Sequence, residues 1–317
     1  MSPPPTIGID VGGTKIAAAV VDPDGNVIAR RQVPTESDEP SAIVSSMLKV
    51  AREMKAAAPA AAAAGVGAAG LVDVARGVIL GAPNLAYRNV AVRDTLQDRL
   101  GLPVVVDNDA NVAALAEALH GAGRGAGDQI MITVGTGIGG GIIIGGRIYR
   151  GHYGVGAELG HIVIDPDGPV CGCGNRGCWE AVASGTAIGR LARQRVEGGA
   201  GADLLASVGG NLEAITGELV GESALAGSAF ARDVVATIGR LLGIGLASIV
   251  NIFDPEVIVI GGGAAAGTGE LLLGPAREAM MAHVLGPSWR TPVRVVLAEL
   301  GNDAGVVGAA ALARELI

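Results

Sequence analysis

Residues 7–21 read IGIDVGGTKIAAAVV, an apolar strand pattern that is broken by a Gly-Gly-Thr turn and followed by a second apolar run. This pattern is typical of two strands joined by a tight turn. A third strand is expected after Asp24 and Gly25, and apolar residues at helical spacing predict a helix over residues 41–57. The first part of the chain therefore has the pattern of an α/β domain.

A second segment, residues 130–144, reads IMITVGTGIGGGIII and repeats the same pattern. Such self-similarity favours a duplicated α/β architecture, in which each half offers a glycine-rich turn to a ligand in the cleft between them. The remaining predicted elements are strands at 65–70, 104–106 and 257–260 and helices at 111–119, 223–253 and 305–316.

The composition limits the classes of partner. The 317 residues include 31 acidic and 23 basic ones, with no run of Lys and Arg that could follow a nucleic acid backbone. The best candidate for a membrane span, residues 129–146, is interrupted by glycines and is better explained as a pair of strands. Residues 1–6 lack the features of a signal peptide, so we expect a cytoplasmic protein that binds neither nucleic acid nor membranes.

The first turn is a candidate phosphate site. Glycines let backbone amides approach a polyphosphate, and an aspartate at the end of the preceding strand can hold the magnesium ion that accompanies ATP. An ordinary hairpin turn is the alternative, and the turn fits neither GxxxxGK[ST] nor GxGxxG. The candidate residues are Asp10, Gly12, Gly13, Thr14 and Lys15.

The second turn has the same character and the same alternative. Its candidate residues are Thr133, Gly135, Thr136, Gly137 and Gly139. Two such turns in one chain favour a shared phosphate ligand over two unrelated hairpins.

The segment VDNDAN, residues 106–111, lies between an apolar strand and a predicted helix. Phosphoryl transfer to an alcohol needs a carboxylate that accepts the hydroxyl proton, and Asp109 fits this role. Asn108 can hydrogen-bond a neighbouring hydroxyl of the acceptor. We also expect Asp109 to cap the helix, a structural role that is compatible with catalysis.

All three cysteines lie close together and near a histidine. Three thiolates and one imidazole complete a tetrahedral zinc site with no open position, so the zinc would be structural. Reduced cysteines without a metal are the alternative. The predicted ligands are His161, Cys171, Cys173 and Cys178.

Two carboxylates, Glu158 and Glu180, lie beside these ligands in the sequence. Most surface carboxylates are only solvated, but a pair held near a metal loop suits the hydroxyls of a sugar. Ligation of His161 through one ring nitrogen would leave the other nitrogen for a further hydroxyl. The zinc loop therefore predicts a sugar site.

These motifs together resemble the ROK family of sugar kinases and repressors, over essentially the full length of the chain. The segments that carry the resemblance are DVGGTK at 10–15, VDNDAN at 106–111, VGTGIGGG at 134–141, ELGH at 158–161, CGCGNRGCWE at 171–180 and GNDAGVVGAA at 301–310. Within the family, the sequence is most similar to bacterial ATP-dependent glucokinases.

The resemblance implies an actin-like ATPase (ribonuclease H-like) α/β fold with two domains around a cleft, residues 1–112 and 113–317. The last helix, about residues 303–317, would pack back on the first domain. Family residues matching Asp109 act as general base, and others bind the sugar, the zinc or the adenosine. The sugar residues are Asn84, Asn108, Glu158, His161 and Glu180; those on the adenosine side are Gly262 and Gly263.

The resemblance also implies the reaction: ATP-dependent phosphorylation of the 6-hydroxyl of glucose, with magnesium and a structural zinc, by a homodimer or homotetramer. Fructose, mannose and N-acetylhexosamine kinases share these motifs and stay open as alternatives, as does polyphosphate as donor. A sugar-responsive repressor is a further alternative. Family repressors add a helix-turn-helix before the first phosphate strand, and only six residues precede that strand here.

Overall fold

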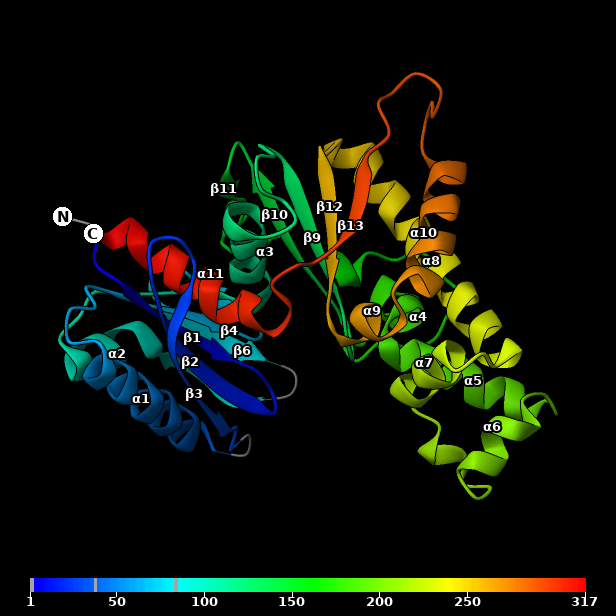
Figure 1. Cartoon of the computed structure of the whole chain (residues 1–317), viewed down its shortest axis with the longest axis horizontal. Helices are drawn as coiled ribbons and strands as arrows, with labels where there is room; N and C mark the ends of the chain where they lie inside the picture. Colours follow the sequence, from blue (N-terminus) through cyan, green and yellow to red (C-terminus); the bar gives the residue numbers. More distant parts are fainter. Residues whose placement is uncertain (1–2, 37–38, 83–84) are drawn as a thin grey trace. The chain divides into compact units, whose positions relative to one another are not determined.

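The computed structural model describes residues 3–36, 39–82 and 85–317 (Figure 1). Its packing divides the chain into two compact units. Unit 1 comprises Met1–Met131, Gly141–Ala157 and Glu299–Ile317, and unit 2 comprises Ile132–Gly140 and Glu158–Ala298. The domain boundary predicted at residue 112 stays a prediction, because these units are defined by packing and not by relative movement.

Unit 1 is built on a five-stranded sheet in the order β3-β2-β1-β4-β8. Strands β1 to β3 are antiparallel and form the predicted hairpin and its third strand, whereas β1, β4 and β8 are parallel. The bounds are β1 Thr6–Val11, β2 Lys15–Val21, β3 Val27–Pro34, β4 Ala64–Ala68 and β8 Val104–Asn108.

Four helices cover this sheet: α1 Pro40–Ala57, α2 Val92–Leu100, α3 Asp109–His120 and α11 Ala304–Ala313. Figure 1 shows α1 and α2 on one side of the sheet and α11 on the other. The side chains of β1 explain this arrangement, because successive residues of a strand face opposite sides. Ile7 and Ile9 belong to the core that includes α1, whereas Thr6 donates its hydroxyl to the carbonyl oxygen of Ala310 in α11 at 2.8 Å.

Helix α11 lies against the backbone of the sheet. A β-carbon on Gly8 or on Gly65 would overlap a carbonyl oxygen of this helix, that of Val306 or of Ala309 respectively. Residues 304–313 are themselves mostly Ala, Gly and Val, so small residues on both sides allow the close approach. Helix α11 therefore packs on β1 and β4.

A second, three-stranded sheet in unit 1 was not predicted from the sequence. It consists of β5 Leu71–Asp73, β6 Val78–Ala82 and β7 Leu85–Ala91 in the order β5-β6-β7. Its strands are short and partly polar, and they lack the apolar alternation that marks β1 and β2.

The other five-stranded sheet has the order β11-β10-β9-β12-β13. Its strands are β9 Gln129–Val134, β10 Ile138–Ile144, β11 Arg147–Ile148, β12 Val257–Gly261 and β13 Arg294–Leu297. The order mirrors that of the first sheet, with β9 and β10 in the places of β1 and β2, which supports the predicted duplication. The glycine-rich segment 129–146 is thus a strand pair, as predicted.

Unit 2 contains α4 Trp179–Ala183, α5 Gly185–Glu197, α6 Ala202–Ser207, α7 Gly217–Leu225, α8 Ala229–Phe253, α9 Gly263–Thr268 and α10 Glu270–His283. The predicted continuous helix over residues 223–253 is wrong. The chain leaves the helix at residues 226–228, where Gly227 has a φ of +104° and Ser228 caps α8. A left-handed φ cannot continue an α-helix.

Among the described residues, α8 is long and apolar enough to span a membrane by length and composition. Within the structure, 56% of its apolar window is buried, and it packs against α10 and α7. These contacts are those of a core helix.

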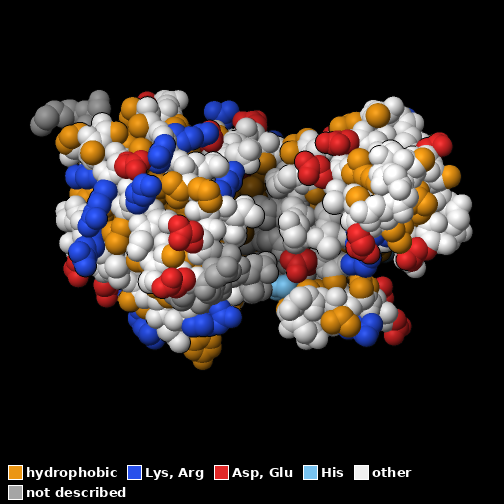
Figure 2. Space-filling view, turned by 90° about the horizontal axis from the view of Figure 1, so that it is seen from below, with side chains coloured by type: hydrophobic (Ala, Val, Ile, Leu, Met, Phe, Trp, Pro, Cys, Tyr) orange, Lys and Arg blue, Asp and Glu red, His pale blue; other side chains and the backbone are white. Residues whose placement is uncertain are grey.

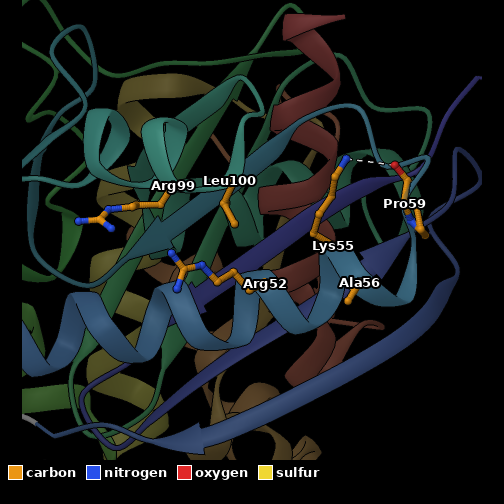
Figure 3. A pocket seen from close by; sticks show the side chains of 6 residues that line it. All are labelled: Arg52, Lys55, Ala56, Pro59, Arg99 and Leu100. Atoms are coloured by element: carbon orange, nitrogen blue, oxygen red, sulfur yellow. Dashed lines mark hydrogen bonds between the residues drawn. The ribbon is translucent and has the colours of Figure 1, made fainter.

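Lys and Arg side chains gather on one face of unit 1 (Figure 2). A shallow pocket of about 350 Å³ lies between the C-terminal ends of α1 and α2, lined by Arg52, Lys55, Ala56, Pro59, Arg99 and Leu100 (Figure 3). Lys55 Nζ donates to the carbonyl oxygens of Pro59 and Ala61 at 3.1 and 2.9 Å. Cations at helix C-termini complement the helix dipole, which explains this surface without a ligand.

The space around two glycines predicts opposite effects for the same substitution. Gly65→Ala should destabilise the protein by about 1–3 kcal/mol or more, because the new methyl group overlaps the backbone of α11. Gly267→Ala, at an exposed position of α9 with open space around the added β-carbon, should stabilise it by about 0.5–1 kcal/mol. Denaturant unfolding measures the free energy of unfolding of both variants. Equal changes in this free energy would contradict the close contact between Gly65 and α11.

Candidate functional site

The first glycine turn, in unit 1, joins β1 to β2 and is fixed from both sides. Gly12 N donates to the carbonyl oxygen of Lys15 at 3.0 Å, and Thr35, which follows β3, donates its hydroxyl to the carbonyl oxygen of Gly12 at 2.8 Å. Gly13 and Thr14 are exposed, and a β-carbon on Gly13 would meet nothing within 4 Å. The turn is therefore a fixed, open stretch of backbone, as an anion site requires.

Asp10 lies on β1 just before this turn, and its carboxyl group packs against Gly305 of α11, where a β-carbon would overlap it. The pKa of Asp10 is raised to about 6, mainly by burial and also by the nearby charge of Asp109, while Lys15 opposes the rise. A bound cation would favour the ionised carboxylate, so the residue fits the predicted magnesium role.

Asp109 is the first residue of α3 and not its cap, so the predicted capping role is wrong. The cap is Asn108, whose Oδ1 accepts from Ala110 N at 2.8 Å and from Asn111 N at 3.2 Å. Asn108 and Asp109 both have short polar side chains that can cap a helix. Only the backbone conformation shows which of the two is the cap. Asp109 Oδ1 accepts from Ala110 N at 2.9 Å.

Burial also raises the pKa of Asp109, while hydrogen bonds from the Ala110 amide and the Asn108 side chain oppose the rise. Asn108 Nδ2 also donates to the carbonyl oxygen of Gly70 at 3.0 Å. The structure thus brings Asp10, Asp109 and Asn108 together in unit 1.

The second glycine turn, residues 135–137 in unit 2, lies at the start of helix α5. Gly185 N donates to the carbonyl oxygen of Gly135 at 2.8 Å, and the hydroxyl of Thr186 donates to that of Thr136 at 2.7 Å. The N-terminus of a helix carries partial positive charge, which favours an anion nearby. Gly185 and Thr186 were missed in the sequence; the available signal was a Ser-Gly-Thr helix start directly after the zinc loop.

The predicted adenosine glycines lie beside this second turn. Gly262 has a φ of +89°, and a β-carbon there would lie 2.5 Å from the carbonyl oxygen of Val134, the last residue of β9. Gly263 begins α9, and a β-carbon there would meet nothing within 4 Å. At position 262, a residue with a side chain could not bring α9 this close to the strand.

The four predicted zinc ligands converge in unit 2. One ligand atom from each of His161, Cys171, Cys173 and Cys178 lies within 4.8 Å of all the others. The sulfur atoms of Cys173 and Cys178 are 3.7 Å apart, and Cys171 Sγ is 3.8 Å from His161 Nδ1.

This arrangement fits zinc. A tetrahedral site with zinc–sulfur bonds of about 2.3 Å places its sulfur atoms about 3.8 Å apart. Burial raises the pKa of the Cys178 thiol to about 12, so a thiolate there needs a cation. The facing atom of the histidine is Nδ1, which leaves Nε2 for another partner.

Glu180 lies between the cysteine cluster and the second turn. Its Oε2 accepts from Ile138 N at 3.0 Å, and its Oε1 lies 3.6 Å from Cys171 Sγ. The sequence placed Glu180 near the cysteines but did not predict its contact with the turn.

Glu158 precedes a short 3₁₀ turn, Leu159–His161, and its carbonyl oxygen accepts from His161 N at 3.0 Å. A β-carbon on Gly160 would overlap the carbonyl oxygen of Ile138, so this turn packs closely on β10. The predicted sugar residue Asn84 lies outside the described residues.

Comparison with known proteins finds a match to the model of the ROK family over residues 6–316. The chain is 45% identical to a glucokinase from Streptomyces coelicolor over 98% of both chains. It resembles the structure of a ROK family glucokinase from Streptomyces griseus in complex with glucose and AMPPNP, with a TM-score of 0.87, 44% identity, and coverage of 98% of this chain and 99% of that one.

A putative xylose repressor from a Caldicellulosiruptor species is 34% identical over 96% of this chain and 77% of its own length. Kinases and a repressor thus share this architecture. Because the family model spans nearly every residue and a relative is 45% identical over almost its whole length, the chain belongs to the ROK family and has the actin-like ATPase fold of its glucokinases.

Proposed function

We propose that this protein is an ATP-dependent hexose kinase that phosphorylates the 6-hydroxyl of glucose. The observation that carries the proposal is near full-length identity of 45% to a glucokinase in a chain that retains the candidate base, both glycine turns and the Cys₃His cluster. A repressor needs no base for phosphoryl transfer, so the retention of Asp109 favours the enzyme.

In the proposed reaction, Asp109 accepts the proton of the sugar hydroxyl as that oxygen bonds to the γ-phosphorus of ATP. The bond from the γ-phosphorus to the bridging oxygen breaks, and ADP leaves with that oxygen. The two glycine turns, including Thr14, Lys15, Thr136 and Gly137, hold the phosphates. Asp10 would hold a magnesium ion, which would supply positive charge to the phosphate oxygens.

The sugar would be held by hydroxyl contacts to Asn108, Glu158, Glu180 and Nε2 of His161. A zinc ion held by His161 and the three cysteines would orient this group, because it would fix the imidazole of His161 and the loop that leads into Glu180. Asn84 would add a further contact, and Gly262 and Gly263 would border the adenosine.

Glucose is favoured over fructose, mannose and N-acetylhexosamines because four glucokinases are 36–45% identical over nearly their whole length, whereas two N-acetylmannosamine kinases are 33–34% identical. ATP is favoured over polyphosphate because the similar ROK family glucokinase from Streptomyces griseus binds AMPPNP, an analogue of ATP. Initial rates with a panel of hexoses and both donors test the proposal. No phosphorylation of any hexose would overturn it. We also propose that the protein is a cytoplasmic homodimer or homotetramer that binds neither nucleic acid nor membranes.

Asp109→Asn tests the general base. The amide keeps the size of the side chain but cannot accept a proton at neutral pH, so kcat should fall by on the order of 10² to 10⁴. Zinc content and ATP affinity should stay near those of the wild type. Steady-state kinetics measures the change, and a variant that keeps more than about a tenth of the wild-type kcat would show that the base lies elsewhere.

Zinc should be present at about one ion per chain. Cys173→Ser removes one ligand from the cluster and should lower both the zinc content and the melting temperature, because the binding energy of a structural metal is partly folding energy. Elemental analysis and thermal unfolding measure the two effects. Wild-type protein that is purified without chelator and contains no zinc would rule out the site.

Asp10 should make stability depend on pH. Its pKa is about 6 in the folded protein and near 3.8 when unfolded, so the folded state binds the proton more tightly. The resulting stabilisation is present below about pH 4 and is lost as the pH rises towards 6. Asp10→Asn should therefore stabilise the protein at pH 7.5, by at most about 3 kcal/mol, and less at pH 5.

The matched control is Asp22→Asn. Hydrogen bonds from Asn26 lower the pKa of this exposed carboxylate, so its removal should give no gain at pH 7.5. Thermal unfolding without nucleotide at both pH values compares the variants. Equal melting temperatures of Asp10→Asn and wild type at pH 7.5 would contradict the buried charge. The kinase activity of Asp10→Asn should be lost, because an amide holds magnesium poorly.

A further inference from the structure

Asp107 is a fully buried carboxylate at the end of β8, two residues before Asp109. Its Oδ1 accepts from Asn108 N at 2.7 Å and from Asn111 Nδ2 at 2.9 Å. The same carboxylate therefore holds residues on both sides of the candidate base.

The other oxygen, Oδ2, accepts from Nε of Arg150 at 2.7 Å. Arg150 follows β11 in the chain and belongs to unit 1, as Asp107 does. Its side chain is 26% exposed, so the pair connects a buried carboxylate to the solvent-accessible edge of the unit. Among the described residues, Arg150 is the cation that forms an ion pair with Asp107.

The loss of one member of a buried ion pair leaves an uncompensated charge. Without Arg150, the uncompensated carboxylate of Asp107 would turn towards water, and this change would weaken its bonds to Asn108 and Asn111. Asn111 depends on this contact, because its own Oδ1 is buried without a partner among the described atoms. Asn108 in turn caps α3 through its side chain.

We propose that Arg150 is a positioning residue for Asp109: by pairing with Asp107, it fixes the turn from which the Asp109 carboxylate projects. The proposal rests on the proposed kinase function. Arg150 acts through Asp107 and not on the substrate, so its loss should affect the chemical step more than nucleotide binding. A shift of about 1 Å in a reacting group can cost on the order of 10²-fold in rate.

The test compares Arg150→Met, Asp107→Asn and the double variant. Each single variant should lower kcat about 10- to 100-fold while KM for ATP changes less than about threefold. In Asp107→Asn, the side chain keeps only one oxygen. It therefore either points its N–H groups at Arg150 or no longer accepts from the backbone amide of Asn108. The double variant buries no unpaired charge, so its kcat should lie within about threefold of the kcat of the less active single variant. If the two residues acted independently, the two losses in kcat would multiply and the double variant would be far less active.

The matched control is Arg31→Met. Arg31 forms an exposed ion pair with Glu53 at 2.9 Å, and its removal should leave kcat unchanged. Thermal unfolding and zinc content of every variant report whether the fold survives.

Chemical rescue covers the case in which Arg150→Met does not fold. Because the Arg150 side chain is partly exposed, added guanidinium ion should enter the space in Arg150→Ala and restore part of kcat, whereas added sodium ion should not. Arg150→Lys, which keeps the charge, should fall between wild type and Arg150→Met.

The outcomes separate the two proposals. A wild-type chain that phosphorylates no hexose would overturn the kinase function together with this role of Arg150. An active wild type with unchanged kcat in folded Arg150→Met, or with effects that multiply in the double variant, would overturn only the role of Arg150.

Discussion

The close contact between helix α11 and the central strands of unit 1 sets the geometry of the first half of the site. Gly8 and Gly65 let the helix lie directly on the sheet, and Gly308 lets it lie equally close to α3, where a β-carbon would overlap the carbonyl oxygen of Val112. The same helix brings Gly305 against the carboxyl group of Asp10. The burial that raises the pKa of Asp10 is thus a consequence of backbone packing by residues near the end of the chain.

Unit 2 relies on a different constraint. The loop around the cysteines has few buried apolar side chains, and Gly172, Cys173, Gly174 and Asn175 are all exposed. Such a segment buries too little surface to order itself, so a metal is the natural source of its stability. Because Glu180 accepts from the amide of Ile138, the ordered loop also holds the second glycine turn. The candidate metal site and the candidate phosphate turn of this unit are therefore directly connected.

The sequence predicted those parts of the fold that depend on local chemistry. The two hairpins follow from apolar alternation around glycine turns, and the metal cluster follows from residue type and spacing. The cap of α3 was assigned to Asp109 and belongs to Asn108, because the two neighbours have the same capping chemistry. The pairing of Asp107 with Arg150 joins residues 43 positions apart, and no local pattern marks such a contact.

Asp10 and Asp109 in unit 1 interact electrostatically, so the protonation of Asp10 and Asp109 depends on whether a cation binds beside them. The charge of Asp109 raises the pKa of Asp10, and by reciprocity ionised Asp10 disfavours the ionisation of Asp109. A cation bound by Asp10 would cancel this repulsion and lower both pKa values. In the proposed reaction, arrival of the metal–nucleotide complex would thus put Asp109 in the ionised form that a general base requires. Asp109 would therefore become ionised when the phosphoryl donor is present. The negative charges of Asp10 and Asp109 repel each other without a ligand, and the same charges attract the bound cation.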